Sequence, residues 1–287
     1  MAKDIPGVLR LHDAIGDEAP AVFDSPHSGL GIPDDFGCLP GKRALHGSGV
    51  DNHVHELFQD VSKHGASFLE ALFLRSYIDP NRNEDEIDPT MLDTPWPAPV
   101  RETPRVKLGS ALIWKIGPPE LHFYDRKLTV AEVEGRIETY WRPYQTTLKE
   151  NLDRLHQRFG QVWHFNCHSN RSYGTPHAPD GPGVERPEME IGTLDGAACE
   201  PGFTELVRET LSGCGYKVEV DGFFKGNHLV RAYSDPAAGR HSMMLEIRKN
   251  LYMDEATLEP NSGFAEVQAN MSKLVRAICD YARSKTG

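Results

Sequence analysis

The sequence of 287 residues is 39% hydrophobic and 25% charged, which is ordinary for a globular protein with a sizeable core. Its formal net charge of −11 argues against nucleic acid as a partner, although a small anionic ligand would need only a local cationic pocket. No window approaches the roughly 18 apolar residues of a membrane span, and residues 1–20 lack the apolar core of a signal peptide, so we expect a cytoplasmic protein without a membrane partner.

Short strand-like runs alternate with helical patterns along the chain. The predicted strands are residues 21–25, 67–74, 110–116, 161–166, 216–220 and 242–247. Predicted helices lie at residues 51–64, from Thr129 onward, at 203–211 and at the C-terminal end. This alternation predicts an α/β fold with a mixed, mostly parallel sheet flanked by helices. Because no linker or repeat divides the chain, we expect a single three-layer domain over residues 1–287.

The longest predicted helix carries two specific signals. Thr129 followed by Glu132 has the sequence of a capping box, which starts that helix. Pro143 lies near its centre and should kink it, because proline lacks the backbone N–H that the helix needs.

Two histidines stand at the ends of predicted strands. His27 follows the run at 21–25, and His168 follows the run at 161–166. Open α/β sheets bind ligands at the carboxyl ends of their strands, so the two imidazoles should meet at one edge. Neutral imidazole is a common zinc ligand, and the pair therefore predicts a metal site. The proline-rich segment 173–188, which begins shortly after His168, is expected to form a rim or lid over it.

The third metal ligand is open at this stage. Asp51 stands at the start of a predicted helix and is either a ligand or only the N-cap of that helix. His55 shares a helical face with Asp51 and would either bind the metal or hydrogen-bond to the aspartate. Asp24 and Glu56 are weaker candidates.

Glu246 interrupts the apolar run at 242–247, where a charge is costly unless it has a partner or a function. We interpret it as a general base beside the metal; the alternative is a structural ion pair with Arg248 on the same face of the strand. Cys167, next to His168, suggests a Cys–His nucleophile as a further alternative. Neighbouring side chains on a strand point to opposite faces, however, which favours a buried structural thiol.

Several basic residues lie near the strand-like runs of this acidic chain: Arg75, Arg82, Lys225, Arg231 and Arg248. Guanidinium groups match the geometry of a carboxylate, so this distribution fits a pocket for a small anionic substrate. The sequence signatures of serine hydrolases, P-loop NTPases, HExxH metalloproteases and dinucleotide-binding folds are absent.

At these positions the chain resembles the N-formylglutamate amidohydrolase (N-formylglutamate deformylase) family. The matching pieces are residues 25–29, 50–51, 78–82, 166–169, 224–226 and 245–247, in family order over most of the chain. The resemblance implies a phosphorylase/hydrolase-like, zinc exopeptidase-like fold, similar to that of zinc carboxypeptidases and aspartoacylases. It also implies hydrolysis of N-formyl-L-glutamate, or of a close N-acyl acidic amino acid, to formate and L-glutamate.

The same resemblance implies a metal site and its ligands. One zinc ion would be bound by His27 and His168. Carboxypeptidases place a glutamate three residues after the first histidine, but this chain has Leu30 there. The remaining ligand must therefore come from elsewhere, and Asp51 is our choice.

The resemblance also implies catalytic and substrate-binding roles. Glu246 would take a proton from the attacking water and return it to the leaving nitrogen. Arg75 would help to stabilise the negative charge that develops on the formyl oxygen. A substrate carboxylate would be held by Arg82 with Asn81. To these two residues we add Lys225 as a further expected contact of the substrate carboxylates.

Two alternative functions stay open. The same apparatus could hydrolyse another N-acyl amino acid or a C-terminal peptide bond, because the size of the pocket cannot be read from the sequence. The chain could instead be a non-catalytic metal-binding module of the same fold, although Glu246 would then have no evident use. Assembly into a homo-oligomer is also left open.

Overall fold

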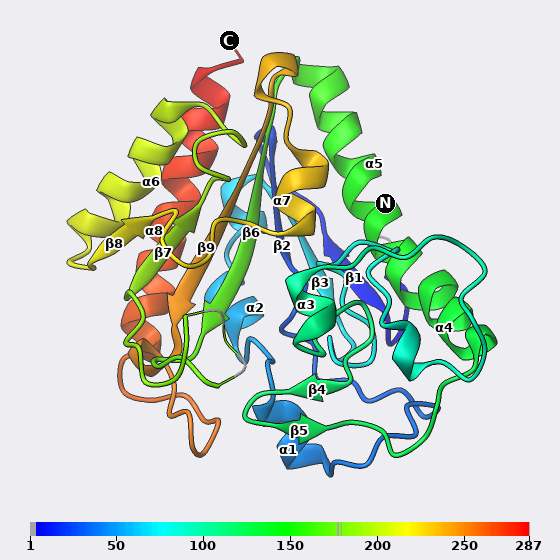
Figure 1. The fold of residues 1–287 in the computed structure, drawn as a ribbon. Helices are drawn as coiled ribbons and strands as arrows, with labels where there is room; N and C mark the ends of the chain where they lie inside the picture. Colours follow the sequence, from blue (N-terminus) through cyan, green and yellow to red (C-terminus); the bar gives the residue numbers. More distant parts are fainter. Residues whose placement is uncertain (1–3, 177, 179, 287) are drawn as a thin grey trace.

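The main sheet of the computed structural model, which describes residues 4–176, 178 and 180–286, has seven strands (Figure 1). Across the sheet they are β1 (Leu9–His12), β3 (Ser67–Ala71), β2 (Ala21–Ser25), β6 (Val162–Asn170), β9 (Arg240–Arg248), β7 (Met189–Gly192) and β8 (Val218–Val220). β3, β2, β6 and β9 are parallel to one another, and β7 is parallel to β8. β1 pairs antiparallel with β3, and β7 pairs antiparallel with β9. The predicted mixed, mostly parallel sheet is confirmed.

Helices cover both faces of this sheet (Figure 1). On one face, α6 (Pro201–Gly213) and α8 (Phe264–Ser284) pack with the short α2 (Val54–Leu57). On the other face lie α5 (Arg142–Phe159) and α7 (His228–Tyr233). Every residue of β2 and β6 is buried, as expected for strands covered on both sides. The predicted α/β class with its three layers is therefore confirmed.

The helix predicted from Thr129 consists of α4 (Val130–Arg136), a π-helical turn (Ile137–Trp141) and α5. Its capping box is confirmed, because the Thr129 hydroxyl accepts from the Glu132 N–H while the Glu132 carboxylate accepts from the Thr129 N–H. Pro143 lies in the first turn of α5, directly after the π-helical turn. The helical irregularity expected at Pro143 is thus a π-helical turn directly before it, a common way for a helix to accommodate a proline.

The predicted helix at 51–64 is wrong in its extent. Only Val54–Leu57 forms an α-helix, and a 3-10 turn follows at Ser62–His64. His53, which precedes the helix, has a left-handed backbone with φ of 64°. This break separates Asp51 from the helix and lets its side chain point elsewhere.

The predicted strand at 110–116 is also wrong. Only its last residue lies in a strand, β4 (Ile116–Gly117), which pairs with β5 (Leu121–His122) in a separate two-stranded sheet. The run is apolar because it is buried, and its backbone is satisfied without a ladder. The Leu112 N–H donates to the Glu86 carbonyl, and the Leu112 carbonyl accepts from the Asp79 N–H. Sequence patterns also missed the four-residue strands β1 and β7.

The remaining elements are short. They are α1 (Lys42–Gly47), α3 (Pro104–Lys107) and 3-10 turns at Pro89–Met91, Pro236–Ala238 and Lys249–Leu251. Within the part of the chain that the structure describes, no helix combines the length and apolar character that crossing a bilayer requires.

Candidate active site

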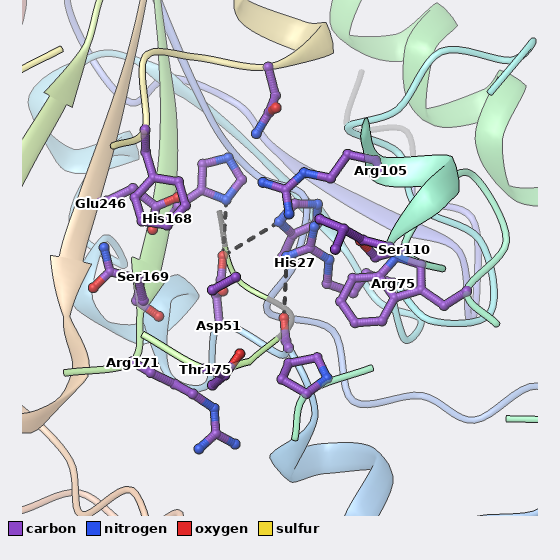
Figure 2. A pocket seen from close by; sticks show the side chains of 18 of the residues that line it. His27, Asp51, Arg75, Arg105, Ser110, His168, Ser169, Arg171, Thr175 and Glu246 are labelled. Atoms are coloured by element: carbon purple, nitrogen blue, oxygen red, sulfur yellow. Dashed lines mark hydrogen bonds and ion pairs between the residues drawn. The ribbon is translucent and has the colours of Figure 1, made fainter. Parts of the chain in front are cut away.

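Two histidines and an aspartate meet at the carboxyl end of the central strands. His27 lies just past β2, and His168 lies near the end of β6. Asp51 is joined to this edge because its N–H donates to the His27 carbonyl, at 2.9 Å. One ligand atom from each of the three side chains lies within 4.8 Å of the others, and all three residues are buried (Figure 2). The structure thus brings together the three residues that were predicted to bind a metal.

On each imidazole, the Nε2 atom lies on the side away from Asp51 and is held by an oxygen atom of a neighbouring side chain. His27 Nε2 lies 2.8 Å from Asp79 Oδ1, and His168 Nε2 lies 2.6 Å from Asn166 Oδ1. With a proton on each Nε2, both Nδ1 atoms keep a lone pair and face Asp51, at 3.5 Å for His27 and 2.9 Å for His168. Metal-binding histidines are usually oriented by an oxygen partner of this kind.

The donor set fits a divalent cation. His27 Nδ1 is buried and has no hydrogen-bond partner among the described residues, which is costly for a polar atom without a ligand. Burial, reinforced by the nearby Arg75 guanidinium, lowers the pKa of His27 and favours the neutral form that binds metals. Burial acts to raise the pKa of Asp51, but its contacts with the His168 and His27 imidazoles outweigh this effect and lower the pKa, so the carboxylate is ionised. Two neutral imidazoles and one carboxylate are typical of a catalytic zinc site.

The other candidates for the third ligand lie elsewhere. The N-cap of α2 is His53, so Asp51 is not the helix cap. His55 Nε2 lies 3.9 Å from Glu56 Oε1, and neither residue belongs to the buried cluster. Asp24 accepts hydrogen bonds from three buried side chains further down the strands and does not join the cluster.

Glu246, His27, Asp51 and His168 all line one cavity. The Glu246 side chain is buried there, with 8% of the residue exposed. It lies beside His168 in the register of β6 and β9. Its Oε2 atom is buried without a hydrogen-bond partner among the described residues. Burial, together with the negative charges of Asp51 and Glu190, raises its pKa to about 8. The alternative ion pair with Arg248 is not formed.

Arg248 has other partners. Its guanidinium pairs with Glu185 at 2.8 Å and with Glu188 at 3.7 Å. Cys167, the other alternative, is fully buried in the apolar cluster beneath α6 and α8, and burial raises the pKa of its thiol well above the usual range. A thiol with so little thiolate is a structural residue, as the strand geometry predicted.

Arg75 and Arg82 both line the cavity. Arg75 donates from Nε and Nη2 to Asp79 Oδ2, at 3.1 and 2.7 Å, and stacks over the Trp114 ring. Arg82 donates to the backbone carbonyls of Ser110 and Asn81, at 3.2 and 2.8 Å. The resulting wall of the cavity is cationic, because Asp79 is shared by both guanidinium groups.

Asn81 and Lys225 are placed differently from the two arginines. Asn81 is fully buried behind His168, where its Nδ2 donates to Asn166 Oδ1 and its Oδ1 accepts from the Leu229 N–H. Lys225 is exposed and pairs with Asp195 at 2.7 Å. Neither residue lines the cavity. The structure therefore does not bring these two predicted substrate-binding residues to the site.

The cavity has a volume of about 130 Å³ and is lined by further cations that sequence patterns missed: Arg105, Arg171, Arg186 and Lys249. Arg105 comes from the proline-rich segment 93–105 and Arg186 from the proline-rich segment 173–188, and neither segment carries a periodic signal. The only sequence signal for Lys249 is that it follows the strand of Glu246.

Described residues of the segment 173–188 border the cavity, as predicted. Thr175, Ala178 and Arg186 contribute to the wall of the cavity, and Thr175 is labelled in Figure 2. Asp180 holds Arg186 in place with two hydrogen bonds, at 2.8 and 3.0 Å.

Comparison with known proteins places this arrangement in a family. The family model of N-formylglutamate amidohydrolase matches residues 19–253. A crystal structure of N-formylglutamate amidohydrolase from Ralstonia eutropha JMP134 is 40% identical, covers 97% of this chain and 99% of its own, and superposes with a TM-score of 0.90. N-formylglutamate deformylase from Pseudomonas putida is 32% identical over 86% of either chain. The enzyme of the same name from Pseudomonas aeruginosa is 30% identical over 93% of this chain and 95% of its own. The chain belongs to the N-formylglutamate amidohydrolase family.

Proposed function

We propose that this chain is a zinc-dependent hydrolase that converts N-formyl-L-glutamate to formate and L-glutamate. The observation that carries the proposal is the buried cluster of His27, Asp51 and His168, with an unpaired imidazole nitrogen, in a cavity that also holds Glu246. The names of the relatives supply the substrate, and the cluster supplies the reason to expect a metal-dependent mechanism.

His27, Asp51 and His168 would hold the metal through two nitrogen atoms and one oxygen atom. A bound zinc ion supplies Lewis-acid chemistry, lowering the pKa of water and polarising a carbonyl oxygen. Asp79 and Asn166 fix the orientation and the tautomer of the two imidazoles. Because these contacts exist within the protein itself, the ligands are preorganised.

Glu246 is the proposed general base. Its unpaired Oε2 is free to take a proton from water and later to return it to the leaving nitrogen of glutamate. The pKa of about 8 applies to the protein without a cation. A nearby positive charge favours the carboxylate and brings Glu246 toward the ionised form that a base needs at neutral pH.

Arg75 and Arg82 are the proposed charge-stabilising residues. Arg75 would stabilise the negative charge that develops on the formyl oxygen, which is worth roughly 3–4 kcal/mol for one well-placed donor. Arg82 lines the same wall. Its Nη2 lies 3.7 Å from Asp79 Oδ2 and makes no hydrogen bond with a described residue, so it is free to bind a substrate carboxylate. Asn81 would support His168 from behind, and Lys225 has no role in this proposal.

The substrate should be small and anionic. A cavity of about 130 Å³ suits a single acyl amino acid better than an extended peptide. Its arginines exceed its nearby carboxylates, so an anionic ligand would be attracted.

The test is product formation by the zinc-loaded protein from N-formyl-L-glutamate, N-acetyl-L-glutamate and a dipeptide ending in glutamate. We expect formate release from the first, with kcat/KM roughly 10–200-fold above that for the acetyl compound, the range for one extra methyl-sized group. Faster hydrolysis of the dipeptide or of the acetyl compound would contradict the assignment, and so would the absence of any turnover.

A further inference from the structure

Arg105 lies on the short helix α3, and its guanidinium points into the cavity toward His27 and the other arginines (Figure 2). The helix is fixed independently of this side chain, because the Thr103 hydroxyl caps it by accepting from the Val106 N–H. No group among the described residues makes a hydrogen bond or an ion pair with the Arg105 guanidinium; its backbone carbonyl is engaged, but its side chain is not.

This distinguishes Arg105 from the other cationic side chains of the cavity. Arg75 and Arg82 donate to Asp79 and to backbone carbonyls. Arg186 is paired with Asp180, and Arg171 and Lys249 each donate to a backbone carbonyl. Each of these cations therefore already has a protein acceptor, and Arg105 alone among the described cavity-lining cations has none.

The charge around Arg105 is unbalanced. Two guanidinium groups lie nearby and share one carboxylate, Asp79, so the group of three arginines carries excess positive charge. Burial, with repulsion from Arg82 and Arg75, lowers the pKa of Arg105 to about 10. A guanidinium with that pKa is still charged at neutral pH, so Arg105 presents a positive charge without a protein counter-ion to the cavity.

We propose that Arg105 is a specificity-determining residue that binds one of the two carboxylates of an N-acyl dicarboxylic amino acid. The inference rests on the proposed function, because that function supplies a substrate with two carboxylates. Arg82 has its Nε and Nη1 committed to backbone carbonyls, so it is suited to one carboxylate only. Arg105 has its whole fork free for the other one.

The experiment measures kcat/KM for three substrates: N-formyl-L-glutamate, its α-carboxamide and its γ-carboxamide. The variants are Arg105→Gln, Arg105→Lys and the control Arg101→Gln. Arg101 lies on the same segment, is exposed and pairs with Asp85 outside the cavity. Arg105→Gln should lower kcat/KM for the diacid by roughly 10–100-fold, as for a lost charged hydrogen bond. Arg105→Lys should recover part of the loss, and Arg101→Gln should change little.

The two carboxamides identify the carboxylate. Arg105→Gln should have little further effect on the one carboxamide that already lacks the partner of Arg105, and its usual effect on the other. An equal loss on all three substrates would overturn the proposal, and so would an unchanged kcat/KM for the diacid. Because the guanidinium makes no hydrogen bond or ion pair with a described residue and lies near two other guanidinium groups, the melting temperature of Arg105→Gln should not fall below that of the wild type.

A binding measurement separates this inference from the proposed function. Calorimetric titration with L-glutamate needs no turnover, and Arg105→Gln should weaken binding by roughly 10–100-fold while Arg101→Gln does not. If the wild type binds L-glutamate in this Arg105-dependent way but releases no formate, only the proposed reaction fails. If Arg105→Gln and Arg101→Gln hydrolyse N-formyl-L-glutamate as efficiently as the wild type, only the role of Arg105 fails. A wild type that does neither overturns both.

Discussion

Strands β2, β6 and β9 carry two sets of buried polar side chains that differ in how well they are satisfied. The inner set is a chain of hydrogen bonds in which His164 Nδ1 lies 2.8 Å from the Ser242 hydroxyl and Nε2 lies 3.0 Å from Asp24. Asp24 also accepts from Asn166 at 2.6 Å and from Tyr144 at 2.8 Å. Each of these polar side chains has a partner.

The outer set lies three or four residues further along the same strands, at His27, His168 and Glu246. Here the Nδ1 of His27 and the Oε2 of Glu246 are buried and unpaired. Each set contains at least one histidine and one carboxylate, all of them buried, so residue type and burial do not distinguish the two sets. The difference is that the inner set is complete without a ligand, whereas the outer set is complete only with one.

The inner set is therefore interpreted as a structural network, and the outer set is the proposed functional one. The inner triad of Ser242, His164 and Asp24 has the order of hydrogen bonds found in serine hydrolases, yet it is fully buried within the sheet. The outer set lines a cavity and contains unsatisfied atoms, and for these reasons we propose it as the reactive one. Substitutions in the outer set should therefore affect chemistry, and those in the inner set should affect stability.

The largest effect is expected for Glu246→Gln. This change removes the proposed general base and keeps the shape of the side chain, so kcat should fall by roughly 10²–10⁴-fold. The metal content should stay at the wild-type level, because Glu246 is not in the ligand cluster. Formate release and metal analysis on the same sample check both statements. Activity close to that of the wild type would remove Glu246 from the mechanism.

The second prediction concerns the pH dependence of stability in the metal-free protein. Folding raises the pKa of Glu246 from its usual 4.5 to about 8, so its contribution to stability is present below pH 4.5 and is lost as the pH rises through 8. Between pH 5 and pH 9, the free energy of unfolding should therefore fall by several kcal/mol in the wild type relative to Glu246→Gln. Urea unfolding at several pH values measures this difference. Parallel curves for the two proteins would show that burial does not disfavour the carboxylate.

A smaller effect is expected for Tyr144→Phe in the inner set. The change removes a hydrogen bond to the buried Asp24 and should cost about 1.5–3 kcal/mol of stability. Metal content and kcat should stay close to wild type at a temperature where the variant is folded. A large loss of kcat in the folded variant would mean that the two sets are coupled, and the division proposed above would be wrong.

The sequence predicted the parts of the site that follow regular strands. His27, His168 and Glu246 stand at or near strand ends, where the alternation of strands and helices already places ligands. Asp51 is harder to assign from the sequence, because it stands at the start of a predicted helix and could be its N-cap. The left-handed backbone at His53, which ends that possibility, is not visible in the sequence pattern. The aspartate that orients His27, Asp79, was seen only as part of a family motif, because the hydrogen bond between them spans distant residues.

The remaining parts of the site come from irregular segments. Arg105 and Arg186 reach the cavity from proline-rich stretches, where no periodicity predicts the direction of a side chain. Lys225 shows the converse: its position beside an apolar run predicts a pocket residue, but its ammonium pairs with Asp195 and does not line the cavity. The wrong strand at 110–116 has a similar cause, since a buried apolar loop has the composition of a strand. Charge clustering along a sequence thus predicted an anionic ligand better than it predicted the residues that bind it.

Zinc titration of the chelator-stripped protein tests most directly the proposal that His27, Asp51 and His168 together bind one divalent cation. We expect one tightly bound equivalent per chain in the wild type and in Glu246→Gln, and its loss in His168→Ala, in which a ligand is removed. Equal zinc binding by the wild type and His168→Ala, or no specific binding by the wild type, would contradict it.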